Sequence, residues 1–289
     1  MRIPRFWAVV QGSGTGPRGE TLFRRAWGWS MSSTAEALDV AHAQLRSALA
    51  GIRSGTRVGG YYPRAPLREP ILDELILDGE QALAVTRNRY GAEILNTDRI
   101  LIADVDLPDL REQASGSLLR RLFRRQAAQP GPRPEPPAVV ERLATIAVWA
   151  RANPGLGVIV YRTASGLRVF VTGVEEPASS DRGSRILAEL DADPIYRELC
   201  RAHGTFRARL TPKPWRLPGL NAPRQRWPYA DDDTERRFLQ WLERYEAAAR
   251  AYAVCRPLAR HGPALSTVDE QIVRLHDERT GAQAALPLA

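Results

Sequence analysis

The sequence predicts an α+β fold in which a central mixed or antiparallel sheet is covered by helices. The first observation is GVIVYRTASGLRVFVT, where two alternating apolar segments, residues 157–163 and 167–172, form a tight hairpin around Ala164-Ser-Gly166. The second is the apolar periodicity of residues 139–152, which is typical of an amphipathic helix. Because an apolar strand at residues 100–104 precedes this helix, the order strand, helix, strand, strand indicates a sheet with at least one helix-covered face.

Residues 1–80 are predicted to form a small strand-helix unit followed by a proline-rich connector. Residues 6–10 and 22–29 have the pattern of two strands across a glycine-rich turn. Ser33-Thr-Ala-Glu36 has the spacing of a capping box, which satisfies free backbone amides at the start of a helix. Three prolines in YYPRAPLREPIL then interrupt regular structure.

Residues 81–230 are predicted to form the sheet-containing core, and residues 231–289 a helical extension. The other strands expected in the core are residues 82–87, 92–96 and 206–211, and its other helices are residues 110–126 and 180–203. The extension is expected to hold two helices, residues 234–255 and 266–279, so that Cys200 and Cys255 both lie in helical patterns.

The composition favours a globular protein with a polyanionic partner. The chain has 289 residues, a net charge of +8 and a pI near 10, and Lys213 is its only lysine. A basic chain suits nucleic acid, although an enzyme with a solvated basic surface has the same composition. No apolar run approaches the ~20 residues that cross a bilayer, and the N-terminus lacks a signal-peptide core. With two cysteines and no disulfide framework, we expect a cytoplasmic location and no membrane partner.

Asp104 and Asp106 stand at the end of the apolar strand RILIADVD. Side chains two apart in a strand point to the same face, so the two carboxylates are expected side by side. Like charges at that distance are unfavourable unless a cation or a proton lies between them, and carboxylate pairs suit Mg²⁺ or Mn²⁺. The alternative is structural: Asp106 opens the turn Asp-Leu-Pro, and Asp104 caps a backbone amide there.

Five further residues are candidates for binding a nucleotide or nucleic acid. They are Ser165, Arg168, Arg207, Arg209 and Lys213. If the hairpin and the strand FRARLT adjoin the strand that ends in Asp106, cations face a carboxylate pair, as phosphoryl-transfer sites require. The alternative is that these arginines pair with acidic residues on separate faces of the sheet.

The order of DVD, a helix and VYRTASGLRVFV resembles the core of the archaeo-eukaryotic primase superfamily, the primase-polymerases. The resemblance implies an RRM-like sheet, with Asp104 and Asp106 as the catalytic, metal-binding motif and Ser165 at the start of a second motif. Arg168 stands where the family carries a nucleotide-contacting histidine, and FRARLT lacks the family's third acidic motif. The C-terminal half also resembles an uncharacterised bacterial protein family, which implies no functional residues.

The expected function is therefore that of a primase-polymerase-like, nucleic-acid-associated protein. Asp104 and Asp106 would hold Mg²⁺ or Mn²⁺, and the cations would bind a nucleoside triphosphate or single-stranded nucleic acid, with weak or lost nucleotidyltransferase activity. Two alternatives stay open at this point. One is a non-catalytic nucleic-acid-binding or assembly module, and the other is a metal-dependent nuclease that uses the same aspartates with water as the nucleophile.

Overall fold

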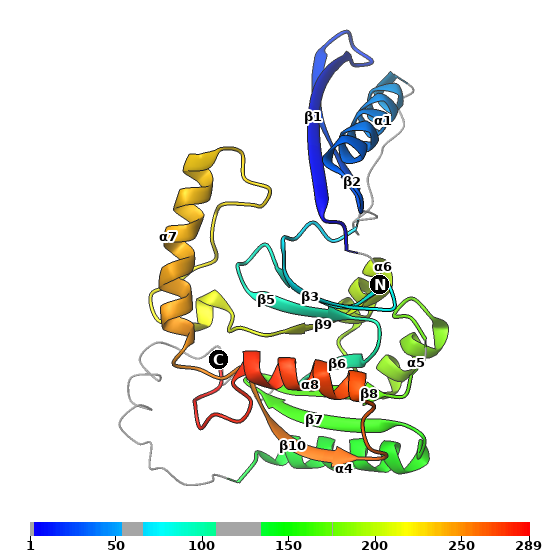
Figure 1. Cartoon of the computed structure of the whole chain (residues 1–289), viewed down its shortest axis with the longest axis vertical. Helices are drawn as coiled ribbons and strands as arrows, with labels where there is room; N and C mark the ends of the chain where they lie inside the picture. The colour runs from blue at the N-terminus through cyan, green and yellow to red at the C-terminus, as the bar shows by residue number, and fades with distance from the viewer. Residues whose placement is uncertain (1–2, 54–65, 108–133, 175) are drawn as a thin grey trace.

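The computed structural model describes residues 3–53, 66–107, 134–174 and 176–289, and it confirms the α+β class. Three antiparallel sheets are flanked by helices (Figure 1). The predicted helix over residues 110–126 lies outside the described residues. Within the described part of the chain, no helix is both long enough and apolar enough to cross a bilayer.

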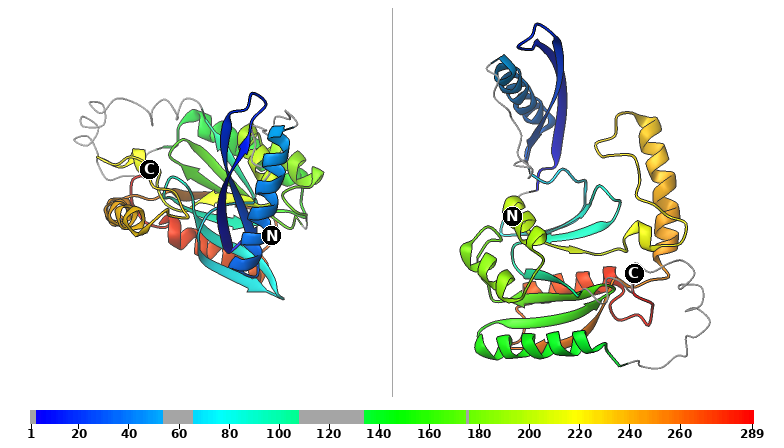
Figure 2. Two further views of the ribbon diagram at one scale, coloured as in Figure 1. Left: turned by 90° about the horizontal axis from the view of Figure 1, so that it is seen from above. Right: turned by 180° about the vertical axis from the view of Figure 1, so that it is seen from behind.

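The N-terminal unit is a long hairpin with one helix against it, as predicted. Strands β1 (Phe6–Thr15) and β2 (Thr21–Ser30) pair along their whole length, and α1 (Thr34–Arg53) packs on one face of the hairpin. A Cβ atom at Gly28 would lie 1.9 Å from the Ala37 carbonyl oxygen, so only glycine permits this close approach. Figure 2 shows the unit projecting from the body of the protein.

The body contains two four-stranded sheets. The first has the order β3-β4-β5-β9, with β3 (Ile71–Leu77), β4 (Glu80–Arg87), β5 (Glu93–Thr97) and β9 (Phe206–Arg209). The second has the order β10-β7-β8-β6, with β6 (Leu101–Asp106), β7 (Gly157–Thr163), β8 (Gly166–Thr172) and β10 (Cys255–His261). Because β3 pairs with β4, residues 71–80 belong to the first sheet rather than to the connector in which the sequence analysis placed them.

Two helices cover opposite faces of the second sheet. From β6 the chain passes through α4 (Pro137–Ala152), β7, β8, α5 (Asp181–Glu189) and α6 (Pro194–His203), and β9 then returns it to the first sheet. The predicted hairpin is confirmed, and in it Val158 lies opposite Val171 and Val160 opposite Val169. α4 lies on one face of this sheet, and α8 (Thr267–Thr280) lies on the other (Figure 1).

The C-terminal segment differs from the helical pattern expected for it. Helix α7 (Asp232–Ala249) ends before Cys255, and Cys255 instead begins β10, an edge strand paired with β7. A bulge interrupts this pairing between Pro257 and Ala259. Proline is tolerated at an edge strand or a bulge, although its presence argues against a strand in the sequence alone.

The Tyr196 hydroxyl joins the two sheets where β6 and β9 lie side by side. It lies 2.8 Å from the Ile102 carbonyl oxygen and 3.0 Å from the Arg207 carbonyl oxygen, and it accepts the Arg207 N–H at 3.2 Å. Desolvation raises the pKa of Tyr196 well above its ordinary value, so the hydroxyl keeps its proton and remains a donor. One side chain of α6 thus replaces the hydrogen-bond ladder that the two strands lack.

We predict that Tyr196→Phe lowers the free energy of unfolding by ~1–3 kcal/mol, because buried backbone groups of both strands lose their partner. Urea-induced unfolding followed by circular dichroism measures this loss. Tyr252→Phe is the matched control, because no hydrogen bond joins its hydroxyl to another described residue. Equal stabilities of the two variants would contradict the role given to the Tyr196 hydroxyl.

Candidate functional site

Asp104 is the counter-ion of a buried arginine. It lies directly opposite Arg168 in the pairing of β6 with β8, and Arg168 Nε donates to Asp104 Oδ1 at 2.9 Å. The Arg168 side chain is 2% exposed and that of Asp104 is 35% exposed. A buried guanidinium requires such a partner, since arginine stays charged in proteins. The structure thus brings Asp104 and Arg168 together as an ion pair.

Arg168 also contacts a histidine on the covering helix. Its Nη1 donates to the Arg209 carbonyl oxygen at 2.8 Å and lies 3.3 Å from His276 Nε2. Because arginine can only donate, His276 Nε2 is the acceptor, and Nδ1 carries the proton toward Asp277 Oδ1 at 2.9 Å. Desolvation, together with the Arg168 charge, lowers the pKa of His276 to about 4, so the imidazole is neutral at pH 7.

Three more cations surround the end of β6, in the segment that runs from β9 into the following turn. Desolvation, together with the charges of Arg209 and Arg216, lowers the pKa of Lys213 to about 8, whereas Asp106 and Asp104 oppose the shift. Desolvation likewise lowers the pKa of Arg209 to about 10. The electrostatic interactions of Arg209 with Asp104, Arg168 and Arg216, and of Lys213 with Asp104 and Asp106, place these four cations near the two carboxylates. We call this group, with Asp104 and Asp106, the β6–β9 junction.

Two predicted site residues, Arg207 and Ser165, do not direct their side chains into the junction through any contact that the structure shows. Arg207 does not face the aspartates: its Nη2 contacts both carboxylate oxygens of Glu69, at 2.7 and 2.8 Å. Ser165 occupies the β7–β8 turn, where its carbonyl oxygen accepts the Leu107 N–H at 3.0 Å. That turn adjoins the end of β6, because Gly166 lies opposite Asp106. Ser165 thus borders the junction through its backbone.

Two members of the site were not identified from the sequence. His276 comes from α8, which no motif linked to the sheet. Arg216 lies in the 3₁₀ turn Pro214–Arg216, three residues after Lys213. The basic stretch PKPWR could therefore have indicated that Arg216 lies near Lys213. Lys213 Nζ also lies 5.9 Å from the centroid of the Trp215 ring, within the range of a cation–π contact.

The donor set of the junction does not fit a divalent cation held by protein side chains alone. One of its two carboxylates is already bound by Arg168, and the surrounding cations repel a bare metal ion. The described residues contain no group of three or more metal-ligating side chains. Mg²⁺ is commonly bound by one or two carboxylates together with substrate phosphates. The predicted metal at Asp104 and Asp106 therefore stays a prediction, and it is compatible with the junction only when phosphates arrive with the ion.

We predict that His276 makes the stability of the protein depend on pH between about 6.5 and about 4. The unfolded chain takes up a proton in this window that the folded chain excludes, so the free energy of unfolding falls as the pH falls, by ~1.4 kcal/mol per pH unit at most. Urea unfolding of the wild type and of His276→Gln at several pH values measures the effect. The difference between the two proteins removes the contribution of His203, whose pKa burial also lowers to about 4. Identical pH slopes would contradict this assignment.

Comparison of the chain with protein-family models, with curated proteins and with solved structures gives no match.

Proposed function

We propose that the chain is a nucleic-acid-associated protein, similar in organisation to primase-polymerases, that binds nucleoside triphosphates at the β6–β9 junction. The observation that carries this proposal is the excess of positive charge there. Arg168, Arg209 and Lys213 outnumber Asp104 and Asp106, and burial lowers the pKa values of Arg209 and Lys213. A triphosphate would neutralise this excess and accept charge-assisted hydrogen bonds, which are stronger than neutral ones.

The same arrangement favours binding over turnover. Arg168 occupies Asp104 Oδ1, and arginines stand on β9 where the resembling family would carry an acidic residue. An arginine in place of a carboxylate removes a metal ligand and adds a phosphate contact. We therefore propose weak or absent nucleotidyltransferase activity. Robust primer synthesis, or metal-dependent cleavage of nucleic acid, by the wild-type chain would contradict this part of the proposal.

We predict that Lys213→Ala and Arg209→Ala each weaken nucleoside triphosphate binding by ~1–3 kcal/mol, as expected for the loss of a charge-assisted contact. Isothermal titration calorimetry with a non-hydrolysable triphosphate measures this loss. Arg151→Ala, which removes an exposed cation from the last turn of α4, is the control and should bind like the wild type. Unchanged affinity in both junction variants would show that the triphosphate does not bind there.

Lys213 also permits a direct chemical readout of the junction. It is the only lysine of the chain, so an amine-reactive reagent followed by peptide mass spectrometry distinguishes it from the N-terminal amine. With a pKa of about 8, the amine should react readily near pH 8, and a bound triphosphate should protect it. Labelling that the triphosphate does not change would contradict the contact proposed for Lys213.

We predict that Mg²⁺ strengthens triphosphate binding and that Asp106→Asn removes this gain, because Asp106 would share the ion with the phosphates. Calorimetry with and without Mg²⁺ measures the difference. Asp39→Asn, a charge-matched change at an exposed position of α1, should retain the gain. A wild-type affinity that is indifferent to Mg²⁺ would favour the structural interpretation, in which Asp106 opens the turn after β6.

A further inference from the structure

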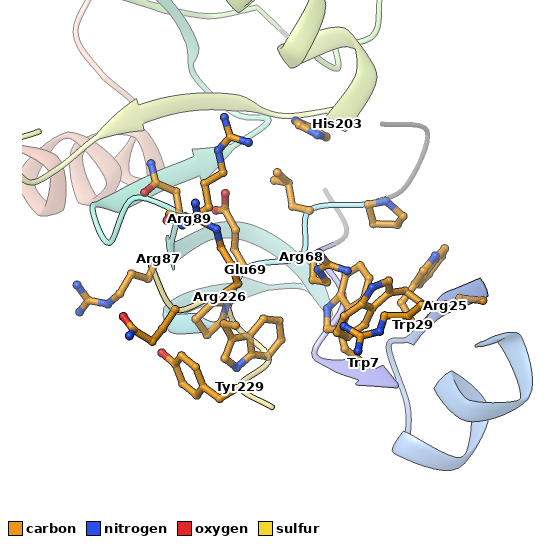
Figure 3. A pocket seen from close by; sticks show the side chains of 18 of the residues that line it. Trp7, Arg25, Trp29, Arg68, Glu69, Arg87, Arg89, His203, Arg226 and Tyr229 are labelled. Atoms are coloured by element: carbon orange, nitrogen blue, oxygen red, sulfur yellow. Dashed lines mark hydrogen bonds between the residues drawn. The ribbon is translucent and has the colours of Figure 1, made fainter. Parts of the chain in front are cut away.

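A cavity of about 880 Å³ lies between the N-terminal unit and the body of the protein (Figure 3). Its walls come from the β1–β2 hairpin, from Gln44, Ser47 and Ala48 of α1, from residues 66–70, from the turn between β4 and β5, and from residues 225–229 before α7. No residue of the β6–β9 junction lines it. The cavity is thus a second concave surface with its own chemistry.

One side of this cavity is built from tryptophan rings. Trp7 and Trp29 are directly opposite each other in the hairpin, and Trp27 lies two residues along β2, so all three are on one face. The other face of the hairpin is covered by α1. Trp227 and Tyr229 line the cavity from the segment before α7. The five rings are half-buried, which leaves aromatic surface accessible within a concave site.

The cavity also has an excess of positive charge. Arg25, Arg68, Arg89 and Arg226 line it, and none of them forms an ion pair with a carboxylate of another described residue. Desolvation lowers the pKa of Arg68, and the charge of Arg25 lowers it further. Glu69 does not offset this charge, because Arg207 already binds both of its carboxylate oxygens.

Cations and rings are interleaved rather than separated. Arg68 Cζ lies 4.0 Å from the centroid of the Trp27 ring. Arg226 Nη1 donates to the carbonyl oxygens of Arg89 and Pro223, which fixes its guanidinium at the cavity wall. Alternating stacking surfaces and fixed guanidinium groups suit a chain that alternates planar rings with anionic groups.

We propose that this cavity binds a short stretch of single-stranded nucleic acid, with bases stacked on the tryptophan rings and phosphates held by the arginines. The site extends the proposed function by providing a place for the strand that is separate from the triphosphate site. A duplex keeps its bases within the stack and fits these rings poorly. A proline-rich or acidic peptide would use either the rings or the arginines, whereas a single strand uses both.

The test measures the fluorescence anisotropy of a labelled oligothymidylate titrated with the wild type, Trp29→Leu and Arg68→Ala at several salt concentrations. Trp29→Leu should weaken binding by about 5- to 150-fold without changing the salt dependence, because it removes stacking alone. Arg68→Ala should weaken binding and reduce the slope of log K against log salt by about 0.7, since one phosphate contact is lost. A duplex of the same length and poly-glutamate should each compete only weakly with the labelled oligothymidylate.

Two control variants separate this site from the triphosphate site. Lys213→Ala and Arg151→Ala should bind the oligonucleotide like the wild type, and both cavity variants should keep their thermal unfolding transition. Oligonucleotide affinity that is unchanged in Trp29→Leu and Arg68→Ala, or lost only in Lys213→Ala, would overturn the cavity assignment. An oligonucleotide affinity that falls in Arg68→Ala but not in Trp29→Leu would contradict the proposed stacking of bases on the tryptophan rings. If the wild type binds the oligonucleotide but no triphosphate, the proposed function of the junction is wrong and the cavity assignment is still supported.

Discussion

The buried guanidinium of Arg168 is the interaction on which the rest of the body depends. It binds Asp104 on β6, the Arg209 carbonyl oxygen on β9 and His276 on α8, so that one group connects both sheets and the helix that covers them. A buried charge without partners would cost several kcal/mol. The ion pair with Asp104 and the contact with the neutral His276 imidazole therefore supply the partners that Arg168 needs in the core.

This constraint also bears on the triphosphate site proposed at the junction. Packing α8 onto the second sheet places His276 within 4.8 Å of the Tyr161 ring centroid and within 4.6 Å of that of Phe170, which closes the face from which Arg168 would otherwise meet water. Arg209 and Lys213 lie beside this closed face, near the end of β6. An anionic ligand bound there would reduce the repulsion between the positive charges of these side chains.

Strand β9 connects this edge with the cavity under the N-terminal unit. Arg207 binds Glu69, which lines the cavity, whereas Arg209 contributes to the β6–β9 junction. Tyr196 holds the β9 backbone against β6 between them. Arg207 and Arg209, two residues apart on β9, thus belong to two different groups of side chains.

The sequence by itself determined the α+β class, the β7–β8 hairpin, α4 and the N-terminal unit, because local periodicity and turn residues encode these elements. It also indicated most of the junction, since Asp104, Arg168 and Lys213 stand at the ends of recognisable strands. Only the tertiary structure placed His276 over the sheet, turned Arg207 toward Glu69, made Cys255 the start of an edge strand and gathered tryptophans and arginines from four segments into one cavity. Those contacts join residues far apart in the chain, and no local pattern encodes which distant surfaces pack together.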